Sequence, residues 1–489
     1  MQEYHNPVIK GFHPDPSICK KGKDFYLVTS SFEYLPAVPL FHSRNLVDWQ
    51  QIGHCLTRDS QIDIHKTPNS GGIFAPTIRY HEGIFYLITT NISKGNFIVQ
   101  TNDLTQGFSE PIWLDIKGID PSLYFENNKV YVQNACFDQQ GSFIQQCEID
   151  INTGTIINGP IEISRGCGGR DVEAPHIYKH NGWYYLFCAE GGTREGHMVT
   201  IQRSQNLYGP FEKCPDNPIV SQRDYGKALL QSVGHADLVE DNDNNWWIVA
   251  LATRPYKHRH HLGRETILLP VTWSKDGWPM VEGKQAKDSY KIQIKEPIYQ
   301  PKKIIHDTFK KTKLSYEYNT IRSFLSDYYE IKNQQLVLYG NKQTLNTHKS
   351  PVFIGVRQTE KECYFETQLS ISLKPSSSAG LAIIMDCCHH MEIGITSQNE
   401  LYVKKTVADL VNINIIEKVI GKIIIGIEAN QEYYQFYYQK DNQKYKVDQT
   451  YVKHLCTETC FSAFCGVYGG MFIEGEGKAF FDYFHYQEK

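Results

Sequence analysis

The feature that most constrains the fold of this chain is a sequence unit that recurs five times in its N-terminal part. Each copy has a small or acidic residue, a short apolar strand, a polar turn, and a second strand that opens with aromatic residues. The copies are PDPSICKKGKDFYLVTS from Pro14, FAPTIRYHEGIFYLITT from Phe74, IDPSLYFENNKVYVQN from Ile119, EAPHIYKHNGWYYLFCAE from Glu173 and HADLVEDNDNNWWIVALA from His235. They lie about 45 to 60 residues apart, close to the period of propeller blades. The repeat therefore predicts a five-bladed β-propeller whose innermost strands line a central channel, with a β-sandwich as the alternative.

The chain changes character after about residue 285, where the stretch KDSYKIQIKEPIYQPKK brings two prolines and no repeat unit. A polar stretch of this kind predicts a linker. Beyond it, segments such as YFETQLSISL from Tyr364 and YYQFYYQ from Tyr433 alternate apolar and polar residues, which is typical of strands with one buried face. We therefore expect an all-β protein, with the five-bladed propeller over residues 1–300 and a β-sandwich over residues 301–489.

Charge and hydropathy narrow the range of partners. The 50 Lys and Arg residues nearly balance the 54 Asp and Glu residues and form no basic run, so nucleic acid is not expected as a partner. No apolar run approaches the length that spans a bilayer, so no membrane partner is expected either. Met1 to Pro7 lack the charged and apolar regions of a signal peptide, and we expect a cytoplasmic protein. The oligomeric state stays open, a homo-oligomer included.

The cysteines do not form a recognisable framework. There are 13, an odd number, without a CxxC pair, as expected for reduced thiols in the cytosol. The run from Cys387 to His390, with two Cys and two His, contains metal-binding residue types. If it lies along a strand, successive side chains point to opposite faces and cannot converge on one ion. We therefore predict no metal site there and expect buried or edge-strand side chains, with a metal role as the alternative.

The repeat alignment brings three acidic residues to equivalent places at the mouth of the predicted channel. The equivalent places hold Asp15, Ala75, Asp120, Ala174 with Glu173 one step earlier, and His235. Carboxylates gathered in a partly dehydrated pocket raise one another's pKa, an arrangement that usually persists for function. Glycoside hydrolysis uses such a set, with one carboxylic acid to protonate the leaving oxygen and one carboxylate to activate water or attack the sugar. Each acid alone has a structural alternative, because Asp beside Pro commonly forms turns.

Six segments in this part of the chain resemble glycoside hydrolase family 43, in family order and across essentially the whole predicted propeller. They are NPVIKGFHPDPSI, GGIFAPTIRYH, GIDPSL, EAPHIYKHNGWYYLFCAEGGT, GHADLVE and GRETILLPV. Within that family the chain is similar to the two-domain β-xylosidases and α-L-arabinofuranosidases. The C-terminal part, which ends in KAFFDYFHY, resembles the family's accessory concanavalin-like β-sandwich more weakly.

The resemblance implies a catalytic role for each of the three acids. Asp15 corresponds to the general base that activates water, and Glu173 to the general acid that protonates the departing oxygen. Asp120 corresponds to a third carboxylate that orients the acid and helps to keep it protonated. Physical chemistry agrees, because an acid that works near neutral pH needs a raised pKa while the base must stay ionised. Inversion also requires base and acid to stand roughly 6.5 to 9.5 Å apart.

The resemblance also implies four substrate-binding residues. Arg264 corresponds to an arginine that hydrogen-bonds sugar hydroxyls, and a surface arginine is the alternative. Phe32 is expected to give the sugar an apolar wall, and Phe74 stands where many relatives carry Trp, a change that affects the width of the pocket; core packing is the alternative for both. His235 resembles a channel histidine that in some relatives contacts a hydrated calcium ion. We expect that no cofactor is required. The resemblance adds a structural calcium ion in the channel, and this ion would be largely hydrated because calcium prefers six to eight oxygen ligands and one histidine cannot hold it alone.

These inferences predict an exo-acting, inverting glycoside hydrolase that releases xylose from the non-reducing end of short xylo-oligosaccharides. An α-L-arabinofuranosidase acting on arabinoxylan or arabinan fragments is the alternative, because the two pentoses present similar hydroxyl patterns. The segment VYVQNACFDQQGSFIQQCEID after GIDPSL departs most from the xylosidases and leaves the sugar open. A sugar-binding propeller without catalysis is a further alternative, which predicts the loss of an acid, but all three are present.

Overall fold

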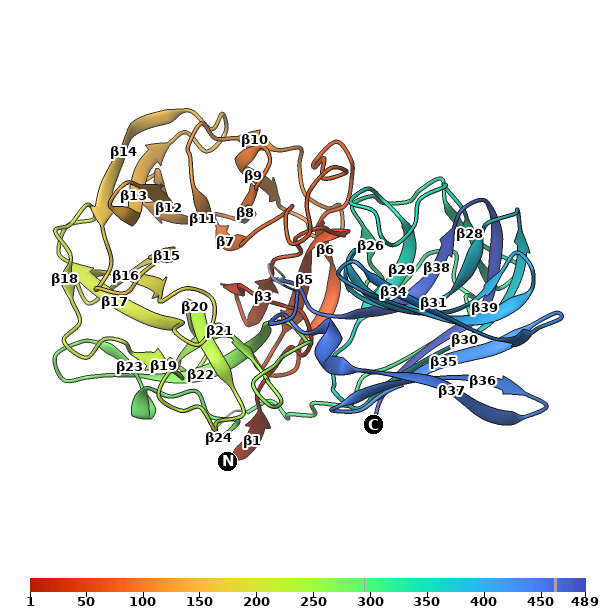
Figure 1. Ribbon diagram of the computed structural model, residues 1–489. Coiled ribbons are helices and arrows are strands. Elements are labelled where there is room, and N and C mark those ends of the chain that lie inside the picture. The colour runs from red at the N-terminus through yellow and green to blue at the C-terminus, as the bar shows by residue number, and fades with distance from the viewer. Residues whose placement is uncertain (294, 461–463) are drawn as a thin grey trace.

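The protein consists of a ring of sheets in its N-terminal part and a two-layer sandwich in its C-terminal part (Figure 1). The computed structural model describes residues 1–293, 295–460 and 464–489. Within these ranges the chain forms strands and two short 3₁₀ helices, η1 (Glu282–Lys284) and η2 (Val452–Leu455), but no α-helix. The predicted all-β class is confirmed. Among these residues no helix has the length and apolar character needed to cross a bilayer.

Five antiparallel sheets form the ring, and each begins with one copy of the sequence repeat. In chain order the sheets contain β2 (Ser17–Lys21), β3 (Asp24–Val28), β5 (Ala37–Ser43) and β6 (Gln50–Leu56); β7 (Thr77–His81), β8 (Ile84–Asn91), β9 (Gly95–Thr101) and β10 (Ile112–Trp113); β11 (Ile119–Glu126), β12 (Lys129–Asp138), β13 (Gly141–Ile149) and β14 (Ile156–Ser164); β15 (Glu173–His180), β16 (Trp183–Glu190), β17 (Met198–Ser204), β18 (Glu212–Lys213) and β19 (Val220–Ser221); β20 (Gln231–Glu240), β21 (Trp246–Thr253), β22 (Glu265–Trp273) and β23 (Pro279–Val281). The apolar strand of each unit is the first strand of its sheet. The predicted five-bladed propeller is confirmed.

The N-terminal segment closes the ring by pairing with the last blade. Strand β1 (Gln2–His5) pairs with β24 (Ser289–Ile292), and the backbones of Ile9 and Thr266 exchange hydrogen bonds of 3.2 and 3.1 Å. Strand β24 belongs to the stretch predicted as a linker. That prediction is wrong for these residues, because Tyr290 and Ile292 alternate with polar neighbours and are buried against the propeller.

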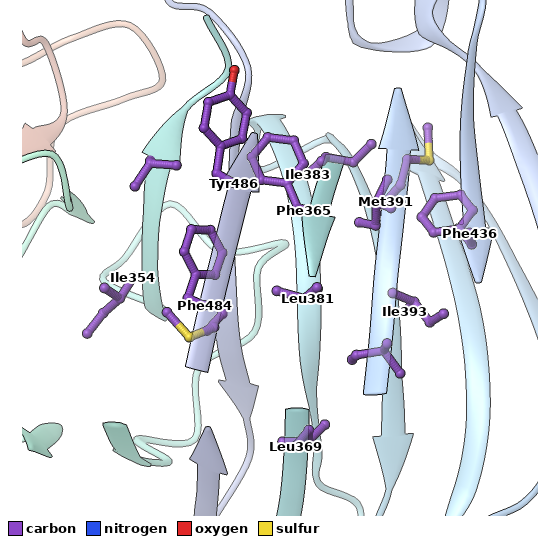
Figure 2. Close-up of a cluster of buried hydrophobic side chains, with 14 of the residues drawn as sticks. Ile354, Phe365, Leu369, Leu381, Ile383, Met391, Ile393, Phe436, Phe484 and Tyr486 are labelled. Carbon is purple, nitrogen blue, oxygen red and sulfur yellow. The ribbon is translucent and has the colours of Figure 1, made fainter. Parts of the chain in front are cut away.

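The C-terminal part is a sandwich of two antiparallel sheets. One sheet contains β25 (Ile304–Asp307), β27 (Tyr329–Lys332), β28 (Gln335–Tyr339), β30 (Cys363–Leu373), β35 (Ile423–Ala429), β36 (Tyr433–Lys440), β37 (Gln443–Tyr451) and β39 (Gly477–Glu488). The other contains β29 (Val352–Arg357), β31 (Ser378–Asp386), β32 (His389–Thr396), β33 (Glu400–Val407), β34 (Leu410–Lys418) and β38 (Tyr468–Glu474). Figure 2 shows Phe365 and Phe484 of the first sheet beside Leu381, Met391 and Ile393 of the second, all fully buried. Each such side chain contributes roughly 1.5–3 kcal/mol of burial free energy.

The hairpin between β31 and β32 overturns one assumption of the sequence analysis. Cys387 and Cys388 form the turn of this hairpin instead of continuing a strand. As a result, Asp386 and His389 are direct partners across the hairpin, with 2.9 Å between Asp386 Oδ1 and His389 Nδ1. The premise that this run lies along one strand is therefore wrong, although only His389 of its four residues belongs to a group of possible metal ligands among the described residues.

The sandwich is fixed against the propeller by contacts of several kinds. Strand β4 (Tyr34–Leu35) of the first blade region pairs with β26 (Thr320–Ile321), and the ring of Tyr34 stacks on that of Tyr468 with 3.8 Å between centroids. Arg254 of the fifth blade lies 2.9 Å from Glu360 of the sandwich. Because a buried ion pair is costly to break, these contacts hold the sandwich in place beside the channel mouth.

Candidate active site

Four of the five aligned positions share an unusual backbone conformation. Asp15, Asp120, Ala174 and His235 have φ angles of 53°, 52°, 52° and 50°. The pairing register shifts beside the last three of them, as it does at a β-bulge, which re-aims a side chain. A residue other than glycine costs on the order of 1–3 kcal/mol in this region, and such strain gathers at functional sites. The repeat alignment therefore identified positions that are structurally equivalent.

Asp15 lies among groups that favour its charged form. The residue is 4% exposed. One carboxylate oxygen accepts a hydrogen bond of 2.8 Å from Arg264 Nη1, and the other accepts one of 2.5 Å from Ser30 Oγ. His235 Nδ1 lies 3.5 Å from the first oxygen. Burial alone would raise the pKa of Asp15, but Arg264, His235 and Ser30 together lower it below its usual value, so this side chain stays ionised.

Glu173 and Asp120 have the opposite tendency. Burial raises the pKa of Glu173 well above its usual value, and the negative charges of Asp120 and Asp15 raise it further. Burial also raises the pKa of Asp120 to about 6, although His235 and the backbone N–H of Ala174 oppose the shift. Among the described residues no Lys or Arg forms an ion pair with either carboxyl group. Near neutral pH the pair of carboxyl groups is therefore expected to carry one proton.

Aromatic side chains gather around Arg264. Its guanidinium carbon lies 5.6 Å from the ring centroid of Phe32 and 5.7 Å from that of Phe464. The ring centroid of Phe32 lies 5.1 Å from that of Phe74 and 6.1 Å from that of Phe464. Arg264 Nη1 also donates a hydrogen bond of 3.3 Å to Thr193 Oγ1. The structure thus brings the predicted residues Phe32, Phe74 and Arg264 together beside Asp15.

Three residues of this site were not identified from the sequence. Ser30 holds Asp15, Thr193 holds Arg264, and Phe464 reaches the site from the sandwich. A signal for Ser30 existed, because a polar residue occurs near the end of the second strand in every repeat, as in Thr90 and Glu190. Phe464 lies outside the repeats and had no comparable signal.

Deeper in the channel, a charged cluster surrounds Asp237. This carboxylate accepts hydrogen bonds of 2.8 Å from Arg79 and 2.6 Å from Ser17, and a further one from the Tyr178 hydroxyl. Arg79 Nη2 also donates a 2.9 Å hydrogen bond to Nδ1 of His176, whose pKa burial lowers to about 3. The cluster is neutral overall and fully paired, so it braces the inner strands.

The described residues near His235 do not fit a directly bound calcium ion. Calcium takes six to eight oxygen ligands. Of the described carboxylates in the channel, Asp15 is engaged by Arg264 and Asp237 by Arg79, so too few free oxygens remain for such a site. No chemical step is therefore assigned to an ion at this position.

A cavity of about 390 Å³ borders the site through Arg264 and Phe464 and is lined by both domains. Its other lining side chains include the cations Arg194, Arg223 and Lys227. It is large enough for part of an oligosaccharide. Its lining includes Arg264, which donates a hydrogen bond to Asp15, but none of the three acids themselves.

Comparisons with known proteins identify the family of this chain. Residues 4–279 match Glycosyl hydrolases family 43, and residues 306–487 match the Beta xylosidase C-terminal Concanavalin A-like domain. A non-reducing end alpha-L-arabinofuranosidase of Bacteroides ovatus is 35% identical, over 98% of this chain and 93% of that protein. A xylosidase/arabinosidase of Butyrivibrio fibrisolvens is also 35% identical, over 99% of this chain and 98% of that protein. The crystal structure of a xylan beta-1,4-xylosidase from Bacillus halodurans has a TM-score of 0.93 at 29% identity, covering 99% of this chain and 100% of that one. The family model covers more than half of the chain, and the relatives cover nearly all of it. The chain therefore belongs to family 43 of the glycosyl hydrolases.

Proposed function

We propose that this glycoside hydrolase removes one terminal pentose at a time from the non-reducing end of short oligosaccharides, with inversion at the anomeric carbon. The observation that supports this most is the contrast between Asp15 and Glu173. The pKa of Asp15 is lowered and its hydrogen bonds favour the charged form, whereas the pKa of Glu173 is raised well above its usual value. An ionised carboxylate beside a protonated acid is the combination that glycoside hydrolysis uses, and we propose inversion from the family resemblance.

In this proposal Asp15 is the general base. A water molecule loses a proton to the Asp15 carboxylate while the water oxygen bonds to the anomeric carbon. Glu173 donates its proton to the glycosidic oxygen as the bond between carbon and that oxygen breaks, and the sugar leaves with the opposite anomeric configuration. Asp120 raises the pKa of Glu173 and so keeps the acid protonated. The cycle closes when Asp15 gives its proton to solvent and Glu173 takes one up.

Arg264 and the aromatic residues are proposed to bind the terminal sugar. The guanidinium group offers donors to sugar hydroxyls, and the faces of Phe32 and Phe74 suit the apolar C–H surface of a pyranose or furanose ring. Phe464 of the sandwich limits the site on one side, which supports action at a chain end. The leaving part of the substrate then lies in the cavity that Arg264 and Phe464 border.

We propose β-D-xylose as the released sugar, with α-L-arabinofuranose as the second candidate. The names of the relatives support both sugars, because they include an arabinofuranosidase, a xylosidase/arabinosidase and a β-xylosidase of Bacillus subtilis. A pocket that accepts one of these pentoses can offer similar hydrogen bonds to the other, so activity on both is expected.

The test is the initial hydrolysis rate of p-nitrophenyl β-D-xylopyranoside, p-nitrophenyl α-L-arabinofuranoside and xylobiose. Wild type is expected to cleave them, and the ratio of rates identifies the preferred sugar. Proton NMR at early times is expected to show α-xylose as the first product of a β-xyloside; β-xylose would contradict inversion. Asp15→Ala and Glu173→Ala are expected to lose activity on xylobiose, whereas Asp171→Ala, which removes an acid two residues before Glu173, is expected to retain it. No hydrolysis of any of the three substrates by wild type would contradict the proposed substrate class.

A further inference from the structure

A second group of reactive side chains lies in the sandwich, where the hairpin of β31 and β32 meets the segment after η2. Asp386 ends β31 and His389 begins β32. Cys460 follows η2, and its backbone N–H donates a 3.0 Å hydrogen bond to the carbonyl of Cys456. The carboxylate, imidazole and thiol ligand atoms of Asp386, His389 and Cys460 all lie within 4.8 Å of one another. Three different donor atoms thus converge from two separate segments.

His389 and Cys460 are buried, and Asp386 is partly buried. Among the described residues, Asp386 forms an ion pair with His389 but not with any Lys or Arg. Cys460 is 1% exposed, and its thiol makes no hydrogen bond to any described residue. A bound cation would stabilise both the carboxylate and a thiolate here.

We propose that Asp386, His389 and Cys460 bind a structural zinc ion. Zinc accepts nitrogen, oxygen and sulfur donors in one site, whereas calcium and magnesium prefer oxygen alone. Zinc–ligand distances of about 2.0–2.3 Å place tetrahedral ligand atoms about 3.3–3.8 Å apart. The group therefore needs to contract by no more than about 1.5 Å, with water as the fourth ligand. As the zinc–sulfur bond forms, the Cys460 thiol releases its proton to solvent.

The two segments that the zinc ion joins also contact the propeller. Beside the site, the Cys387 thiol accepts a 3.3 Å hydrogen bond from Asn69 Nδ2 of the propeller. On the other segment, the backbone N–H of Thr457 donates a 3.0 Å hydrogen bond to the carbonyl of His260 in the fifth blade. A zinc ion at Asp386, His389 and Cys460 therefore stabilises the junction between the domains, and folded protein gains stability as zinc is added.

The experiment uses the full-length protein after treatment with a chelator. Cobalt(II) is added as a spectroscopic substitute for zinc, and the thiolate-to-cobalt charge-transfer band is followed in the near ultraviolet. We expect the band to saturate at one equivalent per chain, to disappear when zinc is added, and not to respond to calcium. Zinc is also expected to raise the melting temperature. Absence of the thiolate band in wild type would overturn the proposal, and this result needs no variant.

The variants locate the site. Cys460→Ala is expected to abolish the band and the zinc-dependent rise in melting temperature, and His389→Ala is expected to weaken zinc binding by more than about tenfold. Cys55→Ala is the matched control, because Cys55 is a thiol of the propeller that is equally buried at 1% exposure, and it is expected to keep both signals. If Cys387→Ala removes the band and Cys460→Ala does not, the metal binds at the Cys387 and His348 pair and the proposed ligand set is wrong.

Discussion

Asp15 and Glu173 both lie at the mouth of the propeller channel, but their surroundings have opposite effects on their charge. Around Asp15, a guanidinium, a hydroxyl and an imidazole favour the ionised form. Around Glu173, burial and two neighbouring carboxylates favour the protonated form. The difference shows how one fold gives two acids of similar intrinsic strength the roles of base and acid, through their neighbours alone.

The largest expected effect follows from removing the base. Asp15→Ala should lower kcat by about 10³ to 10⁴ on every substrate, because it removes the carboxylate that the proposal assigns to the activation of water. Ser30→Ala removes only the hydroxyl that holds this carboxylate and should lower kcat by no more than about tenfold. Steady-state rates on p-nitrophenyl pentosides measure both; similar losses in the two variants would mean that Asp15 has a structural role.

Removal of the cation beside Asp15 tests why this residue is ionised. Asp15 acts in its ionised form, so activity falls as pH drops through its pKa. Arg264→Gln removes the charge that lowers this pKa, and the acidic limb of the kcat/KM profile should move to higher pH. We expect kcat/KM to fall by about 10² at neutral pH and stability to fall by about 3–5 kcal/mol, since a buried carboxylate loses its partner. Urea unfolding measures the second effect. An unchanged acidic limb would contradict the account.

Removal of the neighbouring carboxylate tests why Glu173 is protonated. Glu173 acts in its protonated form, so activity falls as pH rises through its pKa. Asp120→Asn removes a negative charge that raises this pKa, and the alkaline limb of kcat should move to lower pH by about one unit. The same measurement on Asp171→Asn is the control and should show a much smaller shift. A shift of the alkaline limb to higher pH would rule out the proposed coupling.

The smallest effect is expected at Phe464, which acts on the substrate rather than on either acid. Phe464→Ala should raise KM by about three- to tenfold and leave kcat and both limbs of the pH profile unchanged, because it removes contact area from the sugar site. Tyr328→Ala is a suitable control, since Tyr328 is an aromatic residue of the same domain with a similar exposed fraction of 37% against 39%. Equal KM values in the two variants would contradict a contact between Phe464 and the substrate.

The propeller and its acidic residues could be predicted because the repeat shows which positions of the sequence are equivalent from one blade to the next. Once Pro14, Ile119 and Glu173 are aligned, the acids follow at equivalent places, and four aligned positions share the left-handed backbone. The contact between Phe464 and Arg264 could not be predicted in this way, because it joins two domains and Phe464 lies outside the sequence repeat. The roles of the site residues remain predictions that the experiments above test.

The hairpin at Cys387 and Cys388 shows a second limit of sequence patterns. The argument from alternation along a strand is sound, but its premise failed because a two-residue turn falls inside the run. The turn places Asp386 beside His389, and Cys460 joins them from a distant segment. A cluster assembled across a turn and a long loop has no spacing by which the sequence can reveal it.

The most direct test of the assignment of base and acid is the dependence of rate on the leaving group. A good leaving group departs without protonation, so it needs the base but not the acid. On aryl xylosides with acidic phenols, Glu173→Ala should stay within about tenfold of wild type, while on xylobiose it should lose about 10³ or more. Asp15→Ala should lose similar factors on both. If Glu173→Ala is equally impaired on all leaving groups, Glu173 is not the acid and the contrast with Asp15 does not explain the chemistry.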